Sequence, residues 1–211
     1  MSKIVTVDFE KDDSYLSGAL PVPPFPQDPI YPDWPSAWKG LEGILPAIIK
    51  RFNVSQNAAL EFGVEYGYST AALAQLFNSV TGVDTFLGDE HSDLTLGDGS
   101  KRARSDFFEY TKKNVEQWSN IYLIQKDYAN FIKIVDGRVG GVRYDLIHVD
   151  IVHTFEDTFA CGRWAVDHAP VVIFHDTISF IDVRMAVAKI ADQTGKTFYN
   201  YPHHYGLGII A

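Results

Sequence analysis

The segment Asn57–Asp84 constrains the fold of this chain more than any other part. It opens with a short apolar run, Ala58–Phe62, that predicts a buried strand, and a turn with glycines at Gly63 and Gly67 follows. A helical pattern comes next, and a second short strand ends in the carboxylate of Asp84. A strand, a glycine turn, a helix and a second strand with a terminal acid form the βαβ half of a nucleotide-binding fold.

Two acids near this turn favour a cationic ligand over a pyrophosphate. A dinucleotide fold prefers G-x-G-x-x-G, because the pyrophosphate has to sit on a helix N-terminus. Here Glu65 stands where the middle glycine would be, and Glu61 adds a second negative charge at the end of the strand. S-adenosylmethionine, which carries a sulfonium and an ammonium, suits these acids better. A nicotinamide-dependent oxidoreductase built on the same βαβ unit is the alternative, and the glycine spacing counts against it.

Four segments resemble the class I S-adenosylmethionine-dependent methyltransferases. EFGVEYGYST resembles their E-x-G-x-x-x-G first motif, and GVDTFLGDEH is similar to the second-strand segment of a bacterial small-molecule subgroup, the family 24 methyltransferase domain. DLIHVDIVHTFED and VVIFHDT resemble the later D-L-I-x-I-D-G-D-H-S-Y-E and V-x-x-H-D segments of that subgroup. One departure is that Ile151 and Val152 replace the subgroup's G-D, so a second carboxylate is missing. A non-catalytic cofactor-binding member of the fold is therefore another alternative.

The rest of the pattern extends the βαβ unit into an α/β fold. Apolar runs predict further strands at Ile121–Gln125, Tyr144–Asp150 and Val171–Phe174, with helices between them, and two short strands close the chain. We expect a Rossmann-like, doubly wound and mainly parallel sheet. The resemblance implies methyltransferase strand order, with a C-terminal hairpin that contributes one antiparallel strand.

Capping residues and a proline predict where several helices begin. Thr154 and Ser179 each have an aspartate three residues on, which is a capping-box pattern. Asp127 is placed to cap a helix that follows the third strand. Pro46 is expected to kink or divide a helix over Ser36–Phe52.

Composition predicts one domain preceded by an arm. Seven of the ten prolines lie between Pro21 and Pro35, so residues 1–35 are expected to form a Pro-rich N-terminal arm and residues 36–211 the S-adenosylmethionine-binding domain. The net charge of −9 argues against a nucleic-acid partner. The absence of a long apolar run argues against a membrane span. A single cysteine and the lack of a signal-peptide pattern favour the cytoplasm. Trp34 and Trp38, expected to be exposed, favour a homodimer.

The cofactor is expected to lie where the strands end. Open α/β sheets bind ligands outside the carboxyl ends of their strands, so acids at successive strand ends should gather on one rim. Asp84 is expected to hold the ribose diol, and the resemblance implies that Asp127 binds the adenine amino group. The residues expected to bind the cofactor are Glu61, Gly63, Val64, Glu65, Tyr66, Gly67, Ser69, Asp84, Asp127, Tyr128 and Asp150.

The acceptor is expected to bind beside the last two parallel strands. His153 is the expected general base, because imidazole titrates near neutral pH, and Asp150 and Asp157 could hold it in one tautomer. The catalytic residues are expected to be His153, Asp150 and Asp176. Asp150, His175 and Asp176 could coordinate Mg²⁺ or another divalent cation; alternatively, Asp176 caps a helix and His175 packs as a neutral side chain. The expected reaction transfers a methyl group to a hydroxyl of a small-molecule acceptor, a sugar or a natural product.

Overall fold

The computed structural model describes most of the chain from residue 33 onward. The predicted N-terminal arm, residues 1–35, lies outside the described residues except for Asp33 and Trp34. The described ranges are 33–34, 36–88, 106–137 and 141–211.

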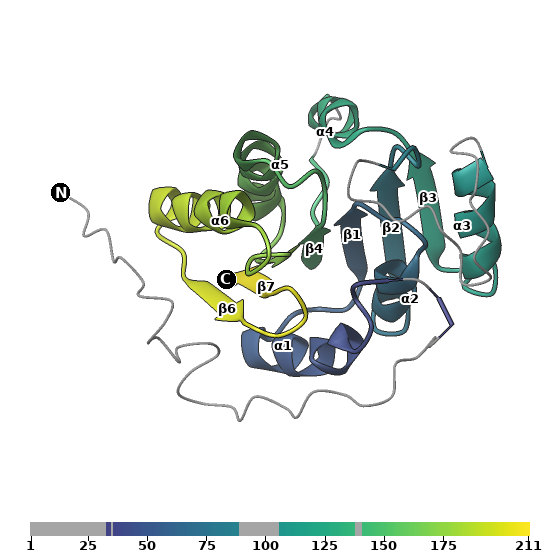
Figure 1. Ribbon diagram of the computed structural model, residues 1–211, viewed down its shortest axis with the longest axis horizontal. Coiled ribbons are helices and arrows are strands. Elements are labelled where there is room, and N and C mark those ends of the chain that lie inside the picture. The colour runs from purple at the N-terminus through teal and green to yellow at the C-terminus, as the bar shows by residue number, and fades with distance from the viewer. Residues whose placement is uncertain (1–32, 35, 89–105, 138–140) are drawn as a thin grey trace.

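A seven-stranded sheet forms the centre of the molecule, with strand order β3-β2-β1-β4-β5-β7-β6 (Figure 1). Neighbours from β3 to β5 pair in parallel, whereas β7 is antiparallel to both β5 and β6. This confirms the expected Rossmann-like sheet with a C-terminal hairpin. The strands are β1 (Ala58–Phe62), β2 (Ser79–Asp84), β3 (Ile121–Gln125), β4 (Leu146–Val149), β5 (Val171–His175), β6 (Phe198–Tyr201) and β7 (Leu207–Ile210).

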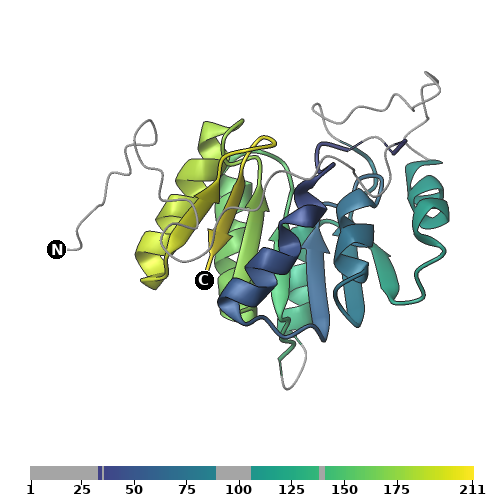
Figure 2. The ribbon, with the colours of Figure 1, turned by 90° about the horizontal axis from the view of Figure 1, so that it is seen from below.

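Helices cover both faces of the sheet (Figure 1, Figure 2). The helices α1 and α2 pack on one face, together with a short 3-10 helix, and α4, α5 and α6 pack on the other. The central strands are therefore buried on both sides and are apolar along most of their length. The helices are α1 (Leu45–Phe52), α2 (Tyr68–Ala74), α3 (Phe107–Val115), α4 (Tyr128–Asp136), α5 (Phe155–His168) and α6 (Ile181–Thr194), and the 3-10 helix is η1 (Leu41–Gly43).

Most of the predicted helix starts are confirmed. The Thr154 hydroxyl accepts the backbone N–H of Asp157 at the start of α5. Asp127 accepts the backbone N–H of Asn130 and caps α4. Pro46 lies in the first turn of α1, so the expected helix is divided into η1 and α1. Proline is tolerated there because the first N–H groups of a helix have no partner within it.

The capping role expected of Ser179 is wrong. Helix α6 begins at Ile181, and its N-cap residue is Phe180, which makes no side-chain capping bond. The backbone N–H groups of Ile178 and Ser179 donate instead to the carbonyl oxygen of Tyr205, at 2.8 and 3.1 Å. Ser179 is therefore held by the turn between β6 and β7, which was not predictable from the local pattern.

Candidate active site

A pocket of about 330 Å³ lies at the carboxyl ends of the central parallel strands. This volume is in the range of small-molecule sites. The predicted site residues that line the pocket are Gly63, Val64, Glu65, Ser69, Asp84, Asp127, Tyr128, Asp150, His153, His175 and Asp176.

Three residues expected to bind the cofactor lie elsewhere. Glu61 is fully buried below the turn. Tyr66 is buried too, and packs edge-on against Phe107 at a ring separation of 4.8 Å. Gly67 is the N-cap of α2, with a φ of 88° that favours glycine. These residues shape the turn from behind and do not line the pocket.

Gly63 joins the two halves of the pocket through its backbone. Its φ is 85°, and a Cβ atom at this position would lie 1.6 Å from the carbonyl oxygen of Asp150. The N–H of Gly63 donates to Val83 on one side, and the N–H of Asp150 donates to Phe62 on the other. The end of β1 is therefore fixed between β2 and β4, and only glycine fits there.

Asp84 lines the pocket, but its carboxylate mainly holds the glycine turn. The backbone N–H groups of Val64 and Glu65 donate to Oδ2 at 2.8 and 3.0 Å. The N–H of Phe86 donates to Oδ1 at 2.6 Å. Because a carboxylate has about four acceptor positions, these bonds leave little capacity for the ribose expected there. Glu65 has a φ of 49°, a conformation that the bonds to Asp84 help to hold.

Asp127 and Tyr128, which follow β3, also line the pocket. Hydrogen bonds from Asn130 lower the pKa of Asp127, so its carboxylate stays ionised. The hydroxyl of Tyr128 donates to Asp157 at 2.8 Å, and burial raises the pKa of Tyr128. Asp157 also accepts the hydroxyl of Thr154. Each carboxylate oxygen of Asp157 thus accepts one hydroxyl.

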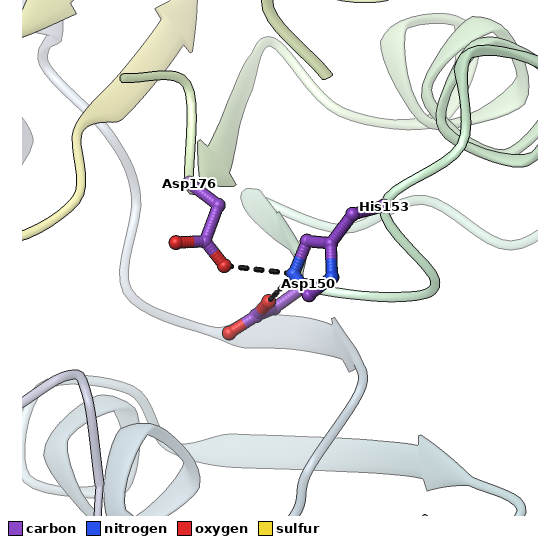
Figure 3. A group of neighbouring side chains, drawn as sticks. All are labelled: Asp150, His153 and Asp176. Atoms are coloured by element: carbon purple, nitrogen blue, oxygen red, sulfur yellow. Dashed lines mark hydrogen bonds and ion pairs between the residues drawn. The ribbon is translucent and has the colours of Figure 1, made fainter. Parts of the chain in front are cut away.

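A second group of side chains meets where β4 and β5 end (Figure 3). The Nε2 of His153 lies 2.7 Å from Oδ2 of Asp176 and 3.9 Å from Oδ1 of Asp150. The Nδ1 of His175 lies 3.4 Å from Asp150 and 3.2 Å from Asp176. Phe180 stacks on the His153 ring at 4.0 Å, with the ring planes 9° apart. Two imidazoles and two carboxylates are therefore in contact at the edge of the pocket.

The surroundings of Asp150 and Asp176 shift the pKa values of these two carboxyl groups in opposite directions. Burial raises the pKa of Asp150, and the charge of Asp176 raises it further, against opposing effects of His175, His148 and His153. Burial also acts to raise the pKa of Asp176, but hydrogen bonds from His153 and His175 outweigh it and hold this pKa well below its usual range. Such a separation is typical of carboxyl groups that divide acid and base roles.

Asp176 adopts a backbone conformation that is unusual for its residue type. Its φ is 64°, in the left-handed region, and its side chain is buried. Non-glycine residues keep this conformation only where surrounding structure holds them, and such positions concentrate at active sites. Here the strained backbone brings the carboxylate to His153.

A divalent cation would find a suitable donor set in this group. Asp150, His153 and Asp176 each offer a ligand atom, and these atoms lie within 4.8 Å of one another. The set differs from the expected one, because His153 takes the place of His175. Two carboxylate oxygens and an imidazole nitrogen suit several divalent ions.

The sequence analysis did not identify two residues at or behind the pocket wall, Trp38 and His148. Trp38 lines the pocket, packs edge-on against His148 at 4.6 Å and stacks on His175 at 5.7 Å. It is 2% exposed, so the exposure on which the homodimer expectation rested is wrong for this residue. His148 lies beside Glu61 across β1 and β4, with His148 Nδ1 2.9 Å from Glu61 Oε1. A histidine inside the apolar run LIHV was the available signal, because Glu61 faces the same side of the sheet.

The sheet order, the glycine turn after β1 and the acids at the strand ends together define a class I S-adenosylmethionine-dependent methyltransferase. A family model described as a methyltransferase domain, Methyltransf_24, matches residues 60–177, more than half of the chain. The protein belongs to this family. No curated protein matches the sequence.

Solved structures with this fold include several methyltransferases. An O-methyltransferase from Bacillus cereus in complex with SAH is 12% identical, with 89% of this chain and 84% of that chain covered and a TM-score of 0.57. TomG from Streptomyces achromogenes, an O-methyltransferase of tomaymycin synthesis in complex with SAM, is 16% identical, with coverage of 85% and 82% and a TM-score of 0.57. CalS11, a calicheamicin methyltransferase, is 16% identical, with coverage of 81% and 76% and a TM-score of 0.59. At these identities the similarity shows the fold alone.

Among the described residues, no helix combines the length and the apolar character needed to cross a bilayer.

Proposed function

We propose that this methyltransferase transfers the methyl group of S-adenosylmethionine to a hydroxyl oxygen of a small molecule. The observation that carries the proposal is the contact between two residues that line the pocket, His153 and Asp176, at 2.7 Å. A histidine held by an ionised carboxylate is a common arrangement for removing a proton from a hydroxyl. Two solved structures with this fold are complexes with SAH and SAM, which supports the proposed cofactor.

The cofactor would lie along the glycine turn. Gly63, Val64, Glu65 and Ser69, which line the pocket, would hold the methionine part, because negative charge at Glu65 suits a cationic ligand. Asp127 and Tyr128, which also line it, would hold the adenine part. When bound, S-adenosylmethionine supplies an electrophilic methyl carbon and leaves as S-adenosylhomocysteine. The protein orients the acceptor oxygen in line with this carbon, which supplies much of the rate enhancement.

The acceptor's proton would pass to His153. Asp176 is ionised, because its pKa is well below its usual range, and it fixes the imidazole through the hydrogen bond to Nε2. As the acceptor oxygen forms its bond to carbon, its O–H bond breaks and the proton moves to Nδ1 of the imidazole, because Nε2 donates to Asp176. The imidazolium that results is stabilised by Asp176 and by Asp150, 3.9 Å away. Phe180 covers one face of the ring and limits its rotation.

Replacing His153 with glutamine tests the base. His153→Gln keeps a polar group beside Asp176 but cannot take up the proton, so we expect methyl transfer to fall about 10²- to 10⁴-fold. Transfer is measured with methyl-labelled S-adenosylmethionine and a panel of phenols and sugar alcohols. The affinity for S-adenosylhomocysteine, measured by calorimetry, should stay within about twofold, since the cofactor residues are unchanged.

His168→Gln is the matched control. His168 lies at the far end of α5, where its Nδ1 is 2.8 Å from the carbonyl oxygen of Trp164, so its replacement should leave the rate of transfer unchanged. Full transfer activity in His153→Gln would show that another group removes the proton. If the wild type does not bind S-adenosylhomocysteine, the proposed cofactor is wrong, whatever the role of His153.

A divalent cation on Asp150, His153 and Asp176 is a second candidate, favoured by the donor atoms within 4.8 Å. In this alternative the cation, and not His153, would lower the pKa of the acceptor hydroxyl. Dialysis against EDTA separates the two. Our proposal expects the transfer rate to be retained after dialysis. A loss of more than about tenfold that Mg²⁺ restores, together with Mg²⁺ binding seen by calorimetry and absent from His153→Gln, would favour the cation.

A further inference from the structure

Exposed apolar side chains gather beside the proposed acceptor site. Of the large hydrophobic residues exposed within the described ranges, Tyr122 lies on β3, Ile134 on α4 and Leu87 in the segment after β2. The other five lie just after β4, between β5 and the second turn of α6, and in the turn before β7. We call these five the apolar shelf: Val152, Ile178, Ile181, Met185 and Tyr205, each between 43% and 55% exposed.

Some shelf residues lie at the pocket, and two of them contact each other. Val152 is one of the pocket-lining residues. The ring of Tyr205 lies 6.3 Å from that of His175, another lining residue. The N–H of Ile178 donates to the carbonyl oxygen of Tyr205 at 2.8 Å, which fixes these two side by side.

The first turns of α6 continue the same surface. Ile181 follows Phe180, whose ring stacks on His153 at 4.0 Å. Met185 lies one helical turn further along α6, at i+4 from Ile181, and therefore on the same face of the helix. The shelf thus extends outward from the group that contains the proposed base.

The backbone at Tyr205 has a strained conformation. Tyr205 has a φ of 65° and the preceding His204 a φ of 50°, although neither is a glycine. Bulky residues rarely adopt the left-handed region, and where they do the strain is associated with ligand sites. The carbonyl of Tyr205 is held by the N–H groups of Ile178 and Ser179. Tyr205 has a half-exposed aromatic ring near His175, which lines the pocket.

The apolar character of the shelf and its place beside His153 favour one chemical class of acceptor. An acceptor whose hydroxyl reaches His153 and Asp176 has to place its remaining atoms on the surface that leads away from them, and that surface includes the shelf. Sugar hydroxyls laid on apolar side chains would lose hydrogen bonds to water without replacing them. An aromatic or aliphatic ring would instead bury apolar area against Tyr205 and its neighbours.

We propose that the acceptor belongs to the class of hydroxylated apolar ring compounds, such as phenols, and that its ring lies on the apolar shelf. This inference rests on the proposed function and narrows its substrate class. The reactive oxygen points to His153, and Tyr205 and Val152 contact the ring.

Probe binding to Tyr205 variants tests the shelf. The protein is saturated with S-adenosylhomocysteine and titrated with 2-naphthol or with methyl glucoside in a calorimeter. We expect 2-naphthol to bind more tightly than methyl glucoside, and about tenfold more weakly to Tyr205→Asn than to the wild type. Asparagine tolerates a positive φ, so the turn should be kept. Tyr205→Phe, which keeps the ring, should bind within about twofold of the wild type.

Tyr122→Asn is the matched control, because Tyr122 is 58% exposed and Tyr205 54%, but Tyr122 lies on the edge strand β3. It should leave 2-naphthol binding unchanged. Equal 2-naphthol binding by Tyr205→Asn and the wild type, or tighter binding of methyl glucoside, would overturn the inference.

The same variants separate this inference from the proposed function. The affinity for S-adenosylhomocysteine is measured for the wild type and for each variant. If the wild type does not bind it, the proposed cofactor site is contradicted and the shelf is not. Sedimentation of the wild type and of Ile181→Ser provides a second criterion. A wild-type dimer that Ile181→Ser dissociates would mean that a second copy covers the shelf, and this result would also overturn the inference.

Discussion

Gly63→Ala is expected to abolish cofactor binding and to lower the free energy of unfolding by more than about 4 kcal/mol. The added Cβ atom would lie 1.6 Å from the carbonyl oxygen of Asp150, and both groups belong to backbone that is hydrogen-bonded to neighbouring strands. Neither side can move without separating β1 from β4 or β2. The φ of 85° adds strain for any residue with a side chain. Thermal unfolding and S-adenosylhomocysteine binding measure the two effects.

Gly195→Ala controls for the backbone strain alone. Gly195 ends α6 with a φ of 68°, and a Cβ atom there would meet nothing within 4 Å. Its replacement should cost about 1–2 kcal/mol and leave cofactor binding unchanged. If Gly63→Ala were no less stable than Gly195→Ala, the close approach of Gly63 to Asp150 would not exist in solution.

Glu61→Ala is expected to destabilise the protein by about 2–6 kcal/mol, because two buried polar groups lose their hydrogen-bond partner at about 1–3 kcal/mol each. Glu61 and His148 are fully buried, and Nδ1 of His148 lies 2.9 Å from Oε1 of Glu61. The hydroxyl of Thr70 donates to the other carboxylate oxygen. Removing the carboxylate leaves His148 and Thr70 buried without this partner. Urea unfolding measures the loss.

Two further variants decide whether the pairing causes this effect. Glu109 forms an exposed pair with Lys112, at 3.0 Å, so Glu109→Ala should leave the unfolding midpoint unchanged. The double variant Glu61→Leu/His148→Leu removes the unpaired histidine as well and should recover part of the lost stability, while Thr70 stays without its partner. A double variant as unstable as Glu61→Ala would show that the destabilisation does not arise from the unpaired histidine.

Local patterns predicted the elements of this fold well. The apolar runs of β1, β3 and β5 and the caps at Asp127 and Thr154 depend on residues close together in sequence. The capping prediction for Ser179 failed because its hydroxyl and its backbone N–H both donate to the carbonyl oxygen of Tyr205, 26 residues further on, at a turn whose position no local pattern gives. The tertiary contact overrode the capping preference.

The sequence predicted where in the fold the site lies, but not which contacts its side chains make. Parallel strands end at one edge of the sheet, so Asp84, Asp127 and Asp150 were expected there, and all three line the pocket. The bonding of each side chain was not predictable in the same way. Asp84 accepts N–H groups from the turn, and Asp176 reaches His153 only through a φ of 64°. Such conformations depend on the surrounding chain, which the local sequence does not encode.

The bonds from the glycine turn to Asp84 also affect the thermodynamics of ligand binding. Because the N–H groups of Val64 and Glu65 have a carboxylate partner within the protein, this loop is ordered by folding itself. A ligand that enters it loses its own freedom but does not have to immobilise the backbone that receives it. Association at this end of the pocket should therefore be fast and should leave amide hydrogen exchange in the loop nearly unchanged.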